Sequence, residues 1–233
     1  MSDFFKTIWD GFYINFIAEE RYLFFLEGLK TTLILTIFSF LLGTLIGILF
    51  CAGKRSKNRF ISRLFNLICG FFIEVPTMVL LMIMVYIIFG RTSLPIMWVV
   101  ICGLLMKCGA YLSVIFGTAL DTVGSGEIEA ARTLGMSSWQ AFRYVTLPQT
   151  VKQAMPLYSD QFIITLQETS VVGYLAIVDL TRAASIVSSR TMDAFYGIIA
   201  VTIIYFLIGY VFRKLMGLIK LGSHNRKKVS ACA

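Results

Sequence analysis

The sequence predicts an all-α integral membrane protein with about five transmembrane helices and one further helix at the membrane surface. Of its 233 residues, 58% are hydrophobic and only 15% are charged, whereas soluble domains average roughly 45–50% apolar and about 25% charged residues. The mean hydropathy of +0.80 points the same way. Several nearly uncharged stretches also exceed the ~20 residues that a helix needs to cross a bilayer. This composition leaves no room for a soluble catalytic domain beside the membrane part.

Residues 1–30 are predicted to form an amphipathic leader. Apolar side chains recur there at helical spacing and charged side chains occupy the other faces, a pattern typical of a helix lying in the membrane interface. The apolar positions are Phe5, Ile8, Trp9, Phe12 and Phe16, and the charged ones are Asp3, Lys6 and Asp10. The stretch lacks the basic start, apolar core and small-residue cleavage site of a signal peptide. A leader that packs against the rest of the protein is the alternative.

The membrane domain is predicted to cover residues 31–218, and its first half contains three spans. The spans are 31–53, which is uncharged, 64–90, which contains Glu74 and Pro76, and 96–120, which contains Lys107. In the first span, Gly43 and Gly47 form a GxxxG pair that permits two helices to pack closely.

A polar interval, residues 121–155, separates these spans from two more. Residues 155–178 form the least apolar span, and residues 180–193 read as a polar loop or re-entrant segment. An uncharged fifth span follows at 194–212, and a basic tail occupies 219–233.

The basic residues predict how the chain is oriented in the membrane. With five spans, the first loop, the polar interval and the residues after 212 share one side, and they hold five, three and six Lys and Arg residues. The opposite side holds only six in all. Because cytoplasmic loops carry an excess of Lys and Arg, we expect the polar interval and the C-terminus in the cytoplasm and the N-terminus outside. The same placement, beside the ends of spans, explains the formal charge of +8 without a nucleic-acid partner.

The polar interval carries the most specific spacing in the chain, and it reads as two short helices joined by a turn. Glu127 suits the first turn of the first helix, and Gly135 suits the left-handed residue that ends it. Ser137 and Gln140 form a capping box for the second helix, which we expect Pro148 to end. The spaced residues are Glu129-Ala130-Ala131, then Gly135, then Leu147-Pro148.

This spacing resembles the EAA loop of the permease subunits of bacterial ABC importers, with Val145 where that family usually has isoleucine. The resemblance implies a type I importer fold in the bacterial cytoplasmic membrane. It also implies that the loop docks into a groove on a separate ATPase subunit. The residues implicated in this coupling are Glu129, Ala130, Ala131, Gly135, Leu147 and Pro148.

The same resemblance implies the partners of the chain. They are ABC ATPase subunits, which would bind ATP and Mg²⁺, a second permease subunit in a homo- or heterodimer, and an extracytoplasmic solute-binding protein. Membrane lipid would surround the spans. The chain itself is then a transport subunit and not an enzyme.

Nothing in the sequence indicates catalysis or a metal site. The only histidine is His224, and the five cysteines include no C-x-x-C pair. The stretch from Gly47 to Lys54 is one residue too long for a phosphate-binding loop, and Arg55 stands where that loop requires Ser or Thr. We therefore expect no catalytic, metal-binding or cofactor-binding residue in this chain.

Over roughly residues 25–218, and most specifically from residue 126 onward, the chain also resembles the polar amino-acid uptake branch of these permeases, the histidine/glutamine/arginine type. The matching residues are Gln161-Phe162 and Glu168-Thr169-Ser170. This branch usually has Ala-Glu-x-x-Arg-Gly just before the loop, whereas residues 113–118 contain neither Glu nor Arg. Either the chain is the divergent half of a heterodimer, or its solute differs from a typical amino acid.

Polar side chains within the predicted spans are the candidate solute-binding residues, because a charge at mid-membrane costs about 2.5–3.5 kcal/mol on insertion scales. Glu168 could receive the ammonium of a solute, or could instead form a buried ion pair with Lys107. Lys107 could hold a solute carboxylate, or could extend its charge to the membrane surface. The full set is Glu168, Thr169, Ser170, Asp160, Gln161 and Lys107.

Two other functions remain open from the sequence. A self-sufficient secondary transporter or channel subunit often shows inverted repeats around a mid-membrane site, and this chain shows no internal repeat. A permease subunit that couples to the ATPase but binds no solute would explain why residues 113–118 lack the Glu and Arg that the branch usually has.

Overall fold

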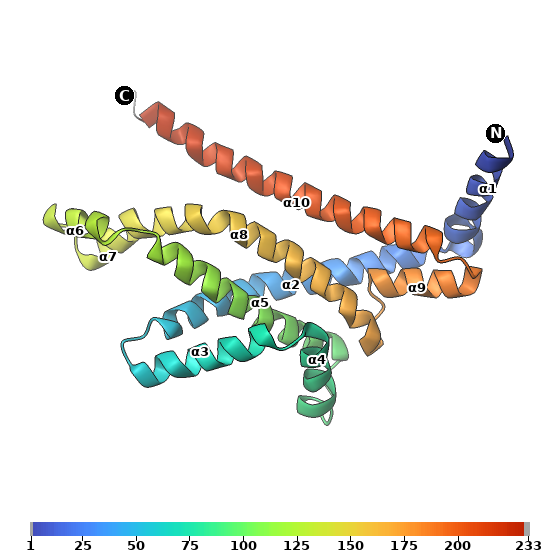
Figure 1. Cartoon of the computed structure of the whole chain (residues 1–233), viewed down its shortest axis with the longest axis horizontal. Coiled ribbons are helices and arrows are strands. Elements are labelled where there is room, and N and C mark those ends of the chain that lie inside the picture. Colours follow the sequence, from blue (N-terminus) through green and yellow to red (C-terminus); the bar gives the residue numbers. More distant parts are fainter. Residues whose placement is uncertain (1, 231–233) are drawn as a thin grey trace. The chain divides into compact units, whose positions relative to one another are not determined.

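The computed structural model describes residues 2–230, and every regular element in that range is helical (Figure 1). Four helices are long: α2 (Tyr22–Lys54), α5 (Ile96–Asp121), α8 (Leu147–Glu168) and α10 (Phe195–Ser230). The shorter ones are α1 (Ser2–Phe12), α3 (Arg59–Glu74), α4 (Thr77–Met82), α6 (Ser125–Thr133), α7 (Ser138–Ala141) and α9 (Leu180–Thr191). Wider π-helical turns cover Tyr13–Ile17, Ile83–Ile88 and Phe142–Thr146, and 3-10 turns cover Ala18–Glu20 and Thr169–Leu175.

Three to five of these helices qualify as membrane spans by length and composition. Tyr22–Lys54, Ile96–Asp121 and Phe195–Leu218 qualify alone. Two pairs qualify only when each is taken as one bent span: Arg59–Glu74 with Thr77–Ile88, and Ser138–Leu175 with Leu180–Thr191. The five spans predicted from the sequence correspond to the case in which both bent pairs cross the membrane.

The N-terminal region differs from the predicted division at residue 30. α2 begins at Tyr22, inside the predicted leader, because the residues from there to Gly53 are mostly apolar and include only two charged side chains, Glu27 and Lys30. α1 leaves Ile8 and Trp9 exposed, as a helix in the membrane interface would. The side chains of Asp3, Phe5 and residues 219–233 lie outside the part of the chain that the structure describes.

The chain divides into two compact units, and the first comprises residues 1–39, 76–104 and 164–211. Its core packs the buried residues Phe25, Leu180, Ala184 and Val187 together. α9 starts at the buried Asp179, whose carboxylate accepts hydrogen bonds from the backbone N–H groups of Thr181 and Arg182. α2 contacts the same helix end, because the hydroxyl of Thr32 accepts a 3.1 Å hydrogen bond from the N–H of Leu180.

The second unit comprises residues 40–75, 105–163 and 212–233. In it α2 and α5 approach closely at the predicted GxxxG pair. A Cβ built on Gly47 would lie 2.8 Å from the Cβ of Leu112, and one built on Gly109 would lie 3.1 Å from the carbonyl oxygen of Gly43. The structure therefore confirms that the small residues permit close packing.

One expectation from the sequence was wrong, and another was wrong in part. Pro148 does not end the second helix of the polar interval but lies in the first turn of α8. In a regular α-helix a proline ring clashes with the carbonyl group four residues earlier. Here the residue four before Pro148 lies in the wider π-helical turn over Phe142–Thr146, so the helix continues through the proline. Residues 180–193, expected as a polar loop or re-entrant segment, contain the regular helix α9 (Leu180–Thr191), which contradicts the loop and leaves the re-entrant segment a prediction.

Candidate functional site

The polar interval folds as the two short helices that its capping residues predict. Gly135 has a φ of 86° and ends α6, with the N–H of Met136 donating to the carbonyl of Ala131. Ser137 and Gln140 form the expected capping box at the start of α7. The turn and the cap of this segment are therefore set by neighbouring residues in the sequence.

Within this segment, the two alanines of the EAA stretch lie in different surroundings. Ala131 is buried, whereas Glu129, Ala130 and Gly135 are exposed. Glu127, in the first turn of α6, accepts a hydrogen bond from the side-chain amide of Gln149 in α8. That contact ties the first short helix to the spanning helix that follows the second.

Three large apolar side chains are exposed in or directly after these short helices, and the sequence argument did not single them out. Leu134 is 82% exposed and Trp139 is 69% exposed. The ring of Phe142 stacks on that of Trp139, with their centroids 5.8 Å apart. Exposed apolar surface of this kind marks a contact with another protein or with lipid. Apolar residues standing in an otherwise polar interval were the signal that could have found them.

In the first unit, Glu168 ends α8 and is partly buried. Its Oε1 accepts a 2.8 Å hydrogen bond from the hydroxyl of Thr77, the first residue of α4. Thr169 is fully buried, and its hydroxyl donates to the carbonyl of Leu166. The hydroxyl of Ser170 donates likewise to the carbonyl of Gln167. Glu168 thus contacts a helix distant in sequence, through Thr77, a partner that the sequence did not suggest.

In the second unit, the other three candidates lie in distinct surroundings. Lys107 is only 4% exposed, and its ammonium donates a 2.8 Å hydrogen bond to the carbonyl of Val75, just after α3. Asp160 is half exposed and forms a 3.2 Å ion pair with Arg213. Gln161 is buried, at 2% exposed.

The stretch that lacks the expected Glu and Arg lies on α5. Ser113 is buried, accepts a 3.3 Å hydrogen bond from the ammonium of Lys54 and donates to the carbonyl of Ala110. The polar contacts of this residue are therefore made within the second unit. Among the described residues, no three His, Cys, Asp or Glu side chains gather where they could hold a metal ion.

The relatives of the chain are permeases. The family model described as "Binding-protein-dependent transport system inner membrane component" matches residues 39–221. The probable amino-acid permease YxeN of Bacillus subtilis is 28% identical over 197 residues, which cover 83% of this chain and 88% of YxeN. The histidine/lysine/arginine/ornithine transport system permease HisM of Salmonella typhimurium is 30% identical over 195 residues, covering 79% of this chain and 83% of HisM.

Solved structures agree with this relationship. The structure titled as an amino acid ABC transporter with histidines has a TM-score of 0.79 and 31% identity, and the match covers 88% of this chain and 97% of that one. The MetNI methionine ABC transporter in an inward-facing conformation shares the fold, with a TM-score of 0.71, 20% identity and coverage of 88% and 98%. The resemblance found in the polar interval is therefore confirmed across most of the chain, and this multi-pass membrane protein belongs to the family of inner membrane components of binding-protein-dependent ABC transport systems.

Proposed function

We propose that this chain forms the translocation path of an ATP-driven importer for a polar amino acid and couples to a separate ATPase through residues 129–148. The observation that carries the proposal is the exposed pair of short helices in that segment, in a chain whose relatives are amino-acid permeases. The chain provides the path, and the partner ATPase provides the energy by hydrolysing ATP with Mg²⁺.

The coupling role rests on exposed surface and on local rigidity. Leu134, Trp139 and Phe142 present apolar surface that a groove on an ATPase subunit would cover. In the same segment Glu129, Ala130, Gly135 and Pro148 are exposed, Leu147 is partly exposed and Ala131 is buried. The left-handed turn at Gly135 and the capping box hold the two helices in one arrangement. A movement of this segment caused by the ATPase would be transmitted to α8 through the hydrogen bond between Glu127 and Gln149.

The principal solute contact is proposed to be Glu168 in the first unit. Its carboxylate is held by Thr77 and would attract the ammonium or a cationic side chain of an amino acid. Thr169 and Ser170 would contribute by shaping the turn that follows Glu168. In the second unit, Asp160, Gln161 and Lys107 are secondary candidates, with Asp160 the most accessible of the three.

The other partners follow from the family. A second permease subunit would complete the path, and an extracytoplasmic binding protein would deliver the solute. Lipid would cover apolar residues exposed on α2, such as Leu41, Leu45 and Leu49. The excess of basic residues supports a cytoplasmic C-terminus and coupling loop.

Uptake in proteoliposomes tests this function. The chain is reconstituted with candidate ATPase subunits, and radiolabelled amino acids are supplied with their binding proteins. We expect uptake only when ATP, the ATPase and a loaded binding protein are all present. Uptake by this chain alone under an ion gradient would overturn the proposal in favour of a secondary transporter.

A further inference from the structure

α3 buries one face and leaves the opposite face exposed. The inner face packs Cys69 against Phe50 of α2 and Ala110 of α5, all within the second unit. The outer face carries four exposed large apolar side chains: Phe60, Leu64, Leu67 and Phe71. Because α3 is the first part of a bent helix pair that qualifies as a membrane span, this outer face is suited to contact with lipid or with another membrane protein.

A hollow of about 600 Å³ lies on this outer face, and its lining is entirely apolar. The lining residues are Leu67, Ile68, Gly70, Phe71 and Phe72. The hollow forms because Gly70 has no side chain, and a Cβ built on it would meet nothing within 4 Å. The volume falls within the range of small-molecule sites, roughly 300–1,000 Å³. Since the lining side chains offer no hydrogen bond, a hydrocarbon chain fits this hollow better than a polar ligand does.

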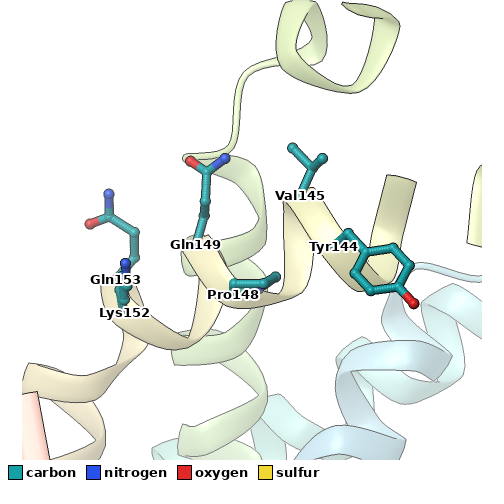
Figure 2. Close-up of a pocket in the computed structure, with 6 residues that line it drawn as sticks. All are labelled: Tyr144, Val145, Pro148, Gln149, Lys152 and Gln153. Carbon is teal, nitrogen blue, oxygen red and sulfur yellow. The ribbon is translucent and has the colours of Figure 1, made fainter. Parts of the chain in front are cut away.

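Another hollow of the second unit, at the start of α8, has the opposite character (Figure 2). Its lining includes the polar side chains of Gln149, Lys152 and Gln153. Lys152 already interacts within the chain, and Gln149 donates a hydrogen bond to Glu127. These side chains therefore already serve internal contacts, which leaves the apolar hollow on α3 as the stronger candidate for an outside ligand.

Five basic residues lie just before α3 or in its first turns, and two of them already have partners. Arg55 forms a 2.7 Å ion pair with Asp121, and the ammonium of Lys54 donates to the hydroxyl of Ser113. The other three are exposed and form no ion pair with any residue that the structure describes: Lys57, Arg59 and Arg63. This end of α3 therefore offers three positive charges to a ligand.

Local hydrogen bonds hold the backbone that carries these charges. Asn58 caps α3, and its side chain accepts a 2.9 Å hydrogen bond from the N–H of Phe60. The hydroxyl of Ser62 donates a 2.7 Å hydrogen bond to the carbonyl of Lys54. An ordered backbone reduces the entropy that is lost when a ligand binds.

The positive charges and the apolar hollow share one row along α3. The members of this row, four residues apart, are Arg59, Arg63, Leu67 and Phe71. Neighbours at this spacing have Cβ atoms about 5–6 Å apart. From Arg63 to Gly70 the helix rises about 10 Å, which is less than one leaflet of a hydrocarbon core about 30 Å thick. The row therefore changes from charged to apolar along the helix axis, as a phospholipid changes from its phosphate to its acyl chains.

We propose that the outer face of α3 binds an anionic phospholipid, whose phosphate pairs with Arg59 and Arg63 and one of whose acyl chains fills the hollow at Gly70. Guanidinium groups pair with phosphate oxygens in a bidentate manner, and basic clusters beside a span attract anionic lipid. The one carboxylate of α3, Glu74, lies at the opposite end of the helix. The proposal depends on neither the solute nor the ATPase of the proposed function.

Native mass spectrometry of the full chain in a neutral detergent tests the headgroup contact. Dioleoylphosphatidylglycerol and dioleoylphosphatidylcholine are titrated separately, and we expect the first to bind at least fivefold more tightly. Arg59→Gln combined with Arg63→Gln should weaken phosphatidylglycerol binding at least fivefold and leave phosphatidylcholine binding unchanged. Arg59→Lys with Arg63→Lys keeps both charges and should stay within threefold of the wild type. The matched control, which removes two exposed arginines of the polar interval and should change neither affinity, is Arg132→Gln with Arg143→Gln.

The acyl-chain contact is tested by filling the hollow. Gly70→Leu should weaken phosphatidylglycerol binding at least threefold, whereas Gly117→Leu, at another site where an added Cβ meets nothing within 4 Å, should not. Melting temperatures of the variants in the same detergent identify any that are misfolded. Equal binding of the two lipids overturns the proposal, and so does phosphatidylglycerol binding that withstands either the arginine pair change or Gly70→Leu.

The same spectra report the oligomeric state of the chain. If Gly70→Leu dissociated a dimer and left lipid binding intact, the outer face would be a contact between two copies of the chain, and the lipid proposal would be overturned. Failure of ATP-driven uptake would count against the proposed function and would not alter this lipid-binding result.

Discussion

The hydroxyl of Thr77 donates a 2.8 Å hydrogen bond to the carboxylate of Glu168, although 91 residues separate them in the chain. Thr77 begins α4 directly after Pro76, and Glu168 ends α8. Both residues therefore stand at a helix end, where the backbone changes direction. The contact fixes the orientation of the one carboxylate that we propose for solute recognition in the first unit.

Replacing Thr77 with valine removes this hydroxyl and keeps the shape of the side chain. A hydrogen bond to a charged group contributes about 1.5–3 kcal/mol, so loss of the oriented carboxylate should raise the KM for solute uptake roughly tenfold or more. Thr77→Ser keeps the hydroxyl and should transport nearly normally. The Glu168→Gln variant, which we expect to transport poorly, shows whether the carboxylate itself is needed. If Glu168→Gln loses transport but the valine variant keeps the wild-type KM, the carboxylate does not depend on its hydrogen bond with Thr77.

The close contact of α2 with α5 predicts the effect of a single methyl group. Gly47→Ala places a Cβ 2.8 Å from that of Leu112, so one helix must move. Overpacking of this kind typically costs about 1–3 kcal/mol, and we expect a lower melting temperature for the purified protein in detergent. Gly117→Ala on α5 is the control, because nothing lies within 4 Å of its new methyl group. Equal stability of the two variants would contradict the packing argument.

Local features of the fold could be read from the sequence because each depends on few neighbours. Gly135 takes the left-handed conformation that a helix end demands, and Ser137 and Gln140 cap each other within one turn. The longest spans were equally predictable, because a run of apolar residues such as that of α2 has no other stable environment. The family resemblance rested on the same local spacing.

Contacts between distant segments could not be predicted. Nothing near Thr77 in the sequence indicates that its hydroxyl meets Glu168. Pro148 was misread because a proline breaks most helices, and only the π-helical turn before it explains the exception. The helical form of α9 was overlooked although the sequence contained its signal: Asp179 is a good helix cap, and apolar Leu180, Ala184 and Val187 recur at helical spacing.

The cap of α9 provides a test of stability in the first unit. Asp179→Ala leaves the N–H groups of Thr181 and Arg182 without their acceptor. Loss of an N-cap typically costs about 0.5–2 kcal/mol, so the variant should melt at a lower temperature. Asp179→Asn keeps an acceptor oxygen and should lose much less. If both variants were destabilised equally, the negative charge of Asp179 and not its capping oxygen would be the stabilising feature.

The coupling loop offers the most direct link between backbone conformation and function. At a φ of 86°, Gly135 occupies a region that a β-branched residue adopts only with strain of about 1–3 kcal/mol. Gly135→Val should therefore displace α7 relative to α6 and uncouple ATP hydrolysis from uptake, while the chain still inserts in the membrane.

Glu129→Lys, which reverses an exposed charge on α6, should also weaken coupling. Gly126→Ala is the matched control, because Gly126 lies in α6 with nothing within 4 Å of an added methyl group. The measurement is the number of solute molecules taken up per ATP hydrolysed in proteoliposomes. A wild-type ratio in both Gly135→Val and Glu129→Lys would contradict a coupling role for this segment, because neither the changed backbone nor the reversed charge would then affect coupling.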